Sequence, residues 1–179
     1  MEMSLENSVL IIIDMQNGLF YGDHPPYQAN QLLKNILQLI DFFKKEKLPI
    51  VLVRHIGKEN TPLAADHHFT QVIPEIMNHQ HFDIILEKTT PSCFYKTNLD
   101  DFLNKLSINK LVIAGLKSDY CIDTTCRIAF EKDYQITLIK DAHSTVNNAL
   151  LSAEQIIEHH NMILGNAFVS LQTTNEFVR

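Results

Sequence analysis

Short apolar runs, rich in β-branched residues, alternate along the chain with segments of helical periodicity. An uninterrupted apolar run of four or five residues is typical of a strand that is buried on both faces of a sheet. The predicted strands span residues 9–13, 50–53, 83–86, 111–114, 136–139 and 167–171.

Between these runs, apolar side chains recur every three or four residues, which is the spacing of one helix face. The first such series runs from Leu33 to Phe43, and Pro49 ends that helix. Further helices are predicted over residues 99–106, from 119 or 120 onward, and from 152 to about 162. Ser152 and Gln155 have the form of a capping box, which marks the start of the last helix.

This alternation predicts an α/β fold, namely a three-layer α/β/α sandwich around a parallel six-stranded sheet. The chain has 179 residues and shows no internal repeat, low-complexity tract or long linker. We therefore expect a single domain over residues 1–179.

Charge and composition narrow the classes of partner. A net charge of −6 and a pI near 5.8 argue against a nucleic-acid partner. The longest apolar run, residues 9–13, is far shorter than the roughly 20 residues of a membrane span. The first residues lack the pattern of a signal peptide, and three irregularly spaced cysteines do not form a disulfide framework. We expect a cytoplasmic protein that acts on a small molecule and has no membrane partner.

Ligands of such folds bind outside the carboxyl ends of the strands, so the polar residues that follow each strand are the candidate site. These residues are Asp14, Arg54, His55, Glu87, Lys88, 117–121 and 141–144. The chain has only five glycines and contains neither a dinucleotide-binding fingerprint nor a P-loop. No cofactor is expected.

Cys121 is the most informative of these residues because it lies at a predicted strand-to-helix turn. A helix N-terminus lowers the pKa of a thiol, and its free N–H groups stabilise an oxyanion. The alternative is a small buried side chain. Cys126 lies on the apolar face of the same helix and is predicted to be core, and the role of Cys93 is open.

Asp14 and Lys88 each end an apolar strand. A desolvated carboxylate has a raised pKa and is suited to take a proton from a thiol or from water. An ammonium beside it would favour thiolate formation or hold the carboxylate ionised. The alternatives are a capping role for Asp14 and a solvated position for Lys88.

Three segments that contain these residues resemble the signature segments of the isochorismatase-like cysteine hydrolases, and they occur in the same order. They are residues 11–17, 87–94 and 115–121, and residues 141–145 and 152–161 resemble the family's last third. The resemblance implies a catalytic triad of Asp14, Lys88 and Cys121, in which Cys121 forms a thioester and Asp14 moves the proton. It also implies a cis peptide between Leu116 and Lys117, an oxyanion hole from the N–H groups of Lys117 and Cys121, and a homodimer or larger oligomer.

The chain departs from the nicotinamidase branch of this family. That branch carries an Asp-x-His pair that helps to hold a metal, whereas this chain has Arg54-His55-Ile56-Gly57 after its second strand. Histidines 67, 68, 79 and 81 lack a carboxylate that would complete a clear ligand set. No metal is expected, and His55 is the best single candidate ligand if one binds.

The substrate pocket is harder to predict from the sequence. Phe20, Phe94 and Tyr120 are the predicted substrate-binding residues, although both phenylalanines fit the core as well. Lys117 adds a second cation and leaves the choice of substrate open. His143 is expected to support the site or an interface, and Ser144 and Thr145 to form a turn and cap.

The resemblance and the placement of the triad favour a metal-independent hydrolase of a small amide. A second hypothesis is isochorismatase-type hydrolysis of a vinyl ether or ester, which needs no covalent step and can proceed without the cysteine. A third is a non-catalytic or redox-sensing thiol protein, although Cys126 is predicted to point away from Cys121.

Overall fold

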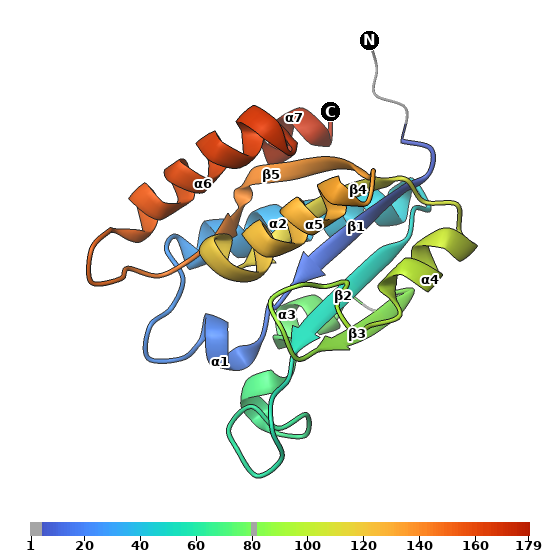
Figure 1. The fold of residues 1–179 in the computed structure, drawn as a ribbon. Helices are drawn as coiled ribbons and strands as arrows, with labels where there is room; N and C mark the ends of the chain where they lie inside the picture. The colour runs from blue at the N-terminus through green and yellow to red at the C-terminus, as the bar shows by residue number, and fades with distance from the viewer. Residues whose placement is uncertain (1–4, 80–81) are drawn as a thin grey trace.

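A six-stranded parallel sheet forms the centre of the computed structural model, which describes residues 5–79 and 82–179 (Figure 1). The strands are β1 (Ser8–Ile13), β2 (Ile50–His55), β3 (Ile84–Lys88), β4 (Lys110–Leu116), β5 (Gln135–Ser144) and β6 (Ser170–Gln172). Their order is β3-β2-β1-β4-β5-β6. The chain thus builds outward from β1 in one direction and then returns to build outward from β4 in the other.

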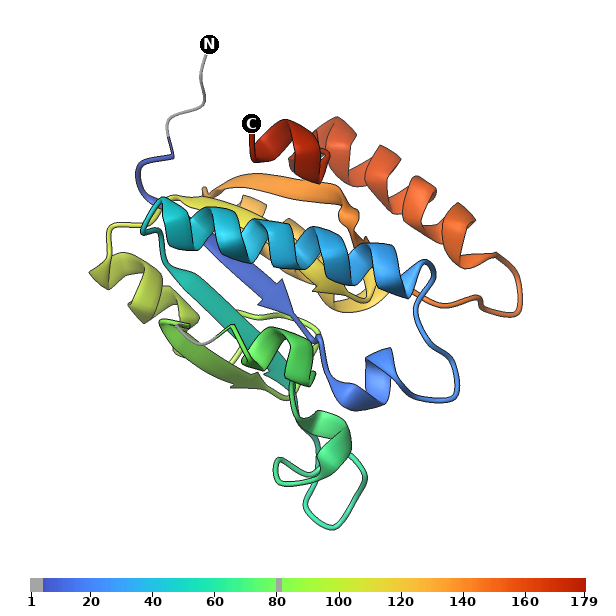
Figure 2. The ribbon, with the colours of Figure 1, turned by 180° about the vertical axis from the view of Figure 1, so that it is seen from behind.

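Helices cover both faces of the sheet. They are α1 (Asn17–Phe20), α2 (Ala29–Lys45), η1 (His68–Thr70), α3 (Pro74–Met77), α4 (Leu99–Lys105), η2 (Ser118–Ile122), α5 (Asp123–Glu131), α6 (Ala153–Ala167) and α7 (Thr174–Phe177). Figure 1 shows α4 and α5 across one face, and Figure 2 shows α2 across the other.

Alternate side chains of β1 enter two separate cores. Val9, Ile11 and Ile13 pack on the face of α4 and α5, whereas Leu10 and Ile12 pack on the face of α2. All five are at most 1% exposed. Burial on both faces explains why this strand is an unbroken apolar run in the sequence. The predicted three-layer sandwich is confirmed.

The first four strands lie where they were predicted, with ends that differ by no more than two residues, and the last two differ more. The strand predicted over residues 167–171 is shorter, because α6 runs on to Ala167 and the N–H groups of Phe168 and Val169 still bond to Leu164. The strand predicted over 136–139 is longer, because β5 continues past a register shift to Ser144. Residue 144 therefore ends a strand and does not form the predicted turn. The capping box of Ser152 and Gln155 is present as predicted.

The carboxyl ends of β1, β2, β3 and β4 lie side by side and lead into the loops that hold the candidate site. Within the described residues, no helix is both long and apolar enough to cross a membrane.

Gly115 permits the close approach of β1 and β4 at this end of the sheet. Its φ is +121°, and a Cβ at this position would lie 2.1 Å from the carbonyl oxygen of Ile13. We predict that Gly115→Ala lowers the free energy of unfolding in urea by more than about 3 kcal/mol, because backbone strain and overpacking both oppose it.

Gly165→Ala is the matched control for this substitution. Its new Cβ would meet only the end of the flexible Leu171 side chain, and it lies in a helix. We expect a change of about 1 kcal/mol or less. Equal losses in the two variants would contradict the role given to Gly115.

Candidate active site

Cys121 lies in the first helical turn after β4. The peptide between Leu116 and Lys117 is cis, as the sequence resemblance implied. The N–H groups of Tyr120 and Ile122 then bond to the carbonyl oxygen of Lys117 and wind the chain into the π-helical turn η2, which continues as α5. This turn holds the Cys121 side chain at the carboxyl end of the sheet, with 9% of the residue exposed.

Asp14 follows the last residue of β1 and is buried. Its N–H donates to the carbonyl oxygen of Val53, and its own carbonyl oxygen accepts from the N–H of Gln16. The backbone has a φ of 53°, a region that Asp tolerates better than most residues. One bond to β2 and one within the turn after β1 therefore fix the backbone of Asp14.

Lys88, the last residue of β3, brings the candidate groups together. Its side chain is completely buried, and its Nζ lies 2.8 Å from Asp14 Oδ2, 3.2 Å from Cys121 Sγ and 3.2 Å from His55 Nδ1. Nζ also donates to the carbonyl oxygen of Thr90 at 3.2 Å. The structure thus brings the three predicted triad residues into contact around one ammonium group, which lies in the interior and not at a solvated position.

Asp14, His55 and Cys121 form a possible metal-ligand set, since their ligand atoms all lie within 4.8 Å of one another. Carboxylate, imidazole and thiolate groups are all ligands that Zn²⁺ accepts. However, each of these three side chains lies within hydrogen-bond distance of Lys88 Nζ. The cation that they surround is the lysine's own, so the arrangement does not fit a metal ion while Lys88 holds this place.

The other histidines named in the sequence analysis have separate contacts. His67 accepts the N–H of Phe69, His68 Nδ1 lies 3.4 Å from Asn17 Nδ2, and His79 pairs with Asp41. His81 lies outside the described residues.

The electrostatics of Cys121 correct the prediction of a lowered pKa. Burial and the nearby Asp14 carboxylate raise the pKa of this thiol to about 12, and the Lys88 ammonium lowers it only in part. For Lys88, burial lowers the pKa, but Asp14 and the neighbouring thiols raise it more, so the net shift is upward. Burial and Lys88 together lower the pKa of His55. The resting site therefore holds a protonated thiol, a charged lysine and a neutral histidine.

A cavity of about 360 Å³ opens onto these groups. Leu19, Leu63, Phe69, Pro91 and Tyr120 contribute apolar surface to its wall. Its polar lining is formed by Asp14, Gln16, His55, Lys117 and Cys121. The cavity is large enough for a small organic molecule whose reacting group lies against Cys121.

Of the three predicted pocket residues, the structure places only Tyr120 at the cavity. Phe20 is buried in the core beneath α2. Phe94 is buried in the opposite core and stacks on Tyr134 with ring centroids 5.8 Å apart. The prediction that both phenylalanines line the pocket is therefore wrong for this cavity, because each side chain packs inside one of the two cores.

The sequence analysis missed Leu63 and Phe69, which come from the long connection after β2. Gln16 fastens this connection to the site, since its Nε2 donates to the carbonyl oxygens of His55 and Thr70 and its Oε1 accepts the N–H of His55. A glutamine two residues after Asp14, at the end of an apolar strand, was the one signal in the sequence that could have indicated this contact.

His143 supports the turn that carries Cys121. It is buried in β5, with Nδ1 2.8 Å from Ser118 Oγ and Nε2 2.9 Å from Asn161 Oδ1. Because the Asn161 oxygen can only accept, Nε2 carries the proton and Nδ1 accepts from Ser118. Thr145 adds a second tie by donating to Asp119 at 2.6 Å. Two polar contacts thus hold η2 against the end of β5.

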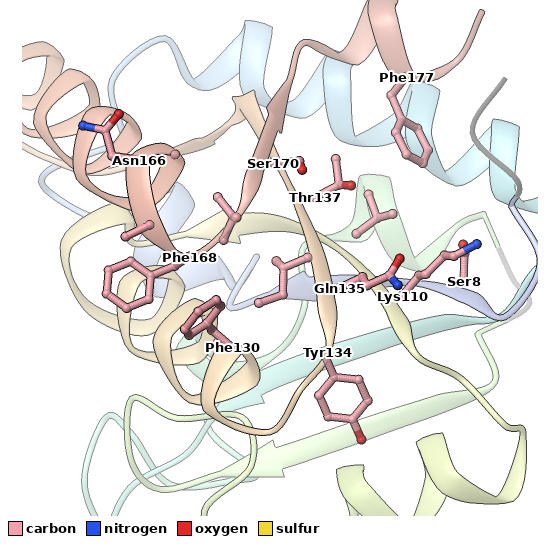
Figure 3. A pocket seen from close by; sticks show the side chains of 15 residues that line it. Ser8, Lys110, Phe130, Tyr134, Gln135, Thr137, Asn166, Phe168, Ser170 and Phe177 are labelled. Carbon is pink, nitrogen blue, oxygen red and sulfur yellow. The ribbon is translucent and has the colours of Figure 1, made fainter. Parts of the chain in front are cut away.

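A second cavity, of about 560 Å³, lies at the opposite end of the sheet (Figure 3). Its lining includes Ser8, Lys110 and Gln135 from the starts of three strands, and the rings of Phe130 and Phe168. None of the three triad residues lines it. Asp14 and Cys121 line the cavity of about 360 Å³ instead.

The sequence and the fold were compared with those of known proteins. The sequence matches the isochorismatase domain over residues 8–174, which is nearly the whole chain. The chain belongs to the isochorismatase family. As a member of this family it is a hydrolase, and the resemblance stated from the three signature segments is confirmed.

Similar proteins differ in what their names say they do. Nicotinamidase 3 of Arabidopsis thaliana is 29% identical over 163 residues, which cover 82% of this chain and 77% of that protein. An isochorismatase from Pseudomonas putida is 28% identical, with a TM-score of 0.89 over 97% of this chain and 91% of that one. N-carbamoylsarcosine amidase from Thermoplasma acidophilum, 23% identical, shares the fold with a TM-score of 0.77 over 94% of this chain and 96% of its own.

Burial of His143 predicts a pH-dependent stability of this isochorismatase-family hydrolase. Burial lowers the pKa of His143 to about 4, whereas a histidine in the unfolded chain titrates near 6.5. Between these pH values the unfolded chain binds a proton that the folded chain does not. The free energy of unfolding should therefore fall by about 1.4 kcal/mol for each pH unit as the pH drops through this window.

Urea denaturation at several pH values measures this dependence. His143→Gln keeps a donor and an acceptor but does not titrate, so its slope in this window should be smaller by that amount. His159→Gln changes an exposed histidine of α6 and should leave the slope as it is. Equal slopes in all three proteins would refute the buried neutral state of His143.

Proposed function

We propose that this protein hydrolyses the C–N bond of a small amide through a thioester on Cys121. The observation that carries the proposal is the position of Lys88 Nζ, which contacts both Asp14 Oδ2 and Cys121 Sγ in a buried site beside a cavity. Nicotinamidase 3, among the similar proteins, is named for the cleavage of such a bond. The name of the Pseudomonas putida relative supports the alternative discussed below.

In the first half-reaction, Asp14 takes the Sγ proton while the sulfur attacks the carbonyl carbon. Asp14 Oδ1 is buried and has no hydrogen-bond partner among the described residues, so this oxygen has the capacity to accept the proton. Lys88 stabilises the sulfur as negative charge develops on it. The C–N bond then breaks, the amine leaves with the proton from Asp14, and the acyl group remains on Cys121.

In the second half-reaction, Asp14 takes a proton from water as the water oxygen attacks the thioester carbon. The C–S bond breaks and the proton returns to the sulfur, so the acid is released and the free thiol is restored. In the overall reaction, the amide and one water molecule give a carboxylic acid and an amine.

The oxyanion of each tetrahedral intermediate needs hydrogen-bond donors. We assign this role to the backbone N–H groups of Lys117 and Cys121, which belong to the turn beside the cavity. Donors that are fixed before the reaction begins lower the barrier without reorganising during it.

Hydrolysis of a vinyl ether or ester is the second candidate, and the family's own name favours it. Asp14 and Lys88 could act as acid and electrostatic partner there without a covalent step. A redox-sensing role is less well supported, because Cys93 and Cys126 are completely buried and burial raises the pKa of both thiols. A cytoplasmic location, a small-molecule substrate and a homodimer or larger oligomer stay predictions.

Substitution of the triad tests the covalent mechanism. With a panel of small primary amides, we expect Cys121→Ala to abolish ammonia release and Asp14→Asn to lower it by about 10²- to 10⁴-fold, the usual contribution of a general base. Cys126→Ala removes a buried thiol outside the site and should retain turnover. Hydrolysis of isochorismate that persists in Cys121→Ala, with no ammonia released from any amide by the unaltered protein, would favour the second candidate.

The raised pKa of Cys121 predicts how this thiol reacts with iodoacetamide. Because that pKa is about 12, the thiolate fraction and the alkylation rate should rise about tenfold per pH unit from pH 6 to 9, with no plateau. Peptide mass spectrometry locates the label. Lys88→Met should slow the reaction at each pH, since it removes the cation that stabilises the thiolate, whereas Lys45→Met at the far end of α2 should not. Fast labelling at pH 6 with a plateau would show a preformed thiolate and contradict the raised pKa.

A further inference from the structure

Lys117 presents a cation to the cavity that no side chain in the described part of the chain neutralises. The residue is half-buried and lines the same cavity as Cys121. Its Nζ lies 5.9 Å from the centroid of the Tyr120 ring, and it forms no ion pair with a described carboxylate. The neighbouring Asp119 carboxylate instead accepts a hydrogen bond from Thr145.

The other charges around the cavity cancel. Asp14 and Lys88 form a buried ion pair, and His55 is held neutral by burial and by Lys88. Lys117 therefore adds an unpaired positive charge to a lining whose carboxylate, Asp14, is already paired with Lys88 behind it. An ammonium without a partner in a partly desolvated cavity attracts an anion more strongly than one in bulk water does.

Lys117 also lines a smaller neighbouring hollow, of about 310 Å³, which is distinct from the cavity shown in Figure 3. The two share Gly18, Leu19, Phe69 and Lys117, and the second hollow adds Asp23 and His24. Asp23 is exposed and does not pair with Lys117. Lys117 thus belongs to the lining of both spaces, together with the apolar residues Leu19 and Phe69.

We propose that Lys117 selects a substrate with an anionic group, so that the substrate class is a small amide with an apolar body and a carboxylate. The proposal rests on the function proposed above. In it, the apolar wall holds the body, the Lys117 ammonium binds the carboxylate, and the amide carbonyl lies against Cys121. The side chain acts in binding, which is separate from the role of the Lys117 backbone N–H.

Two alkylating reagents that differ only in charge test this selection without a known substrate. Iodoacetate carries a carboxylate where iodoacetamide carries a neutral amide, and both react with the thiolate of Cys121. We divide the rate with iodoacetate by the rate with iodoacetamide, so that the thiolate fraction cancels. This ratio is then divided by the same ratio for free N-acetylcysteine. The normalised ratio measures how strongly the cavity prefers the negatively charged reagent. Rates are measured at one fixed alkaline pH, with the label located by peptide mass.

We expect the normalised ratio to exceed one in the unaltered protein and to fall roughly three- to fivefold in Lys117→Met, the size expected of a partly exposed charge pair. Lys117→Arg keeps the charge and should restore most of the preference. Lys45→Met makes the same change of net charge at the other end of the sheet and should leave the ratio unchanged.

The outcomes separate this proposal from the function on which it rests. If both reagents label Cys121 and the ratio does not respond to Lys117→Met, anion selection is wrong and the nucleophile stands. If neither reagent labels Cys121 in the folded protein at any pH, the thiol is inaccessible and the covalent mechanism itself fails. Thermal denaturation of each variant verifies that the folded proteins are being compared.

Discussion

The buried ion pair between Lys88 and Asp14 is the interaction on which the rest of the site depends. Removing two charges from water costs several kcal/mol for each ion, and only a short, well-bonded contact offsets this cost. Here Nζ lies 2.8 Å from the carboxylate and also reaches His55 and the carbonyl oxygen of Thr90. Because each charge would be left unpaired in the interior without the other, the pair fixes the ends of β1 and β3 relative to one another.

The same pair acts on the Cys121 thiol in opposite directions. The carboxylate disfavours a second negative charge nearby, and the ammonium favours it. Since burial adds to the effect of the carboxylate, the resting sulfur keeps its proton. A nucleophile that is protonated at rest requires a base in contact with it, and in the mechanism proposed above Asp14 is that base for the attack as well as for the water step. The helix N-terminus alone does not decide the state of this thiol.

The sequence was sufficient for those features that depend on local pattern. Buried parallel strands are continuous apolar runs, and the polar residue that ends each run must lie at the same edge of the sheet, so Asp14, Lys88 and Cys121 could be placed together. The pocket wall could not be predicted in this way. Phe20 and Leu19 are adjacent apolar residues, yet Phe20 is buried in the core under α2, whereas Leu19 is only partly buried at the edge of that core and lines the cavity. Only the direction of each side chain in the folded chain distinguishes them.

Leu63 and Phe69 reach the cavity because the long connection after β2 folds back toward it. The spacing of apolar residues in the sequence does not predict this folding back.

This difference has a physical basis in how the two parts are held. Asp14 and Lys88 stand at the ends of β1 and β3, and Cys121 lies in the turn after β4; the register of these strands is fixed by the sheet ladder and by both cores. The stretch that supplies Leu63 and Phe69 lies outside the sheet ladder and is held largely by polar contacts: Thr70 Oγ1 bonds to carbonyl oxygens within it, and Gln16 bonds to its backbone. Substitutions in such a connection can reshape the wall without disturbing the ion pair beneath it. Proteins with this fold can therefore keep the same groups beneath the cavity while its wall differs, and the connection and Lys117 are the parts of this wall on which the proposed choice of substrate depends.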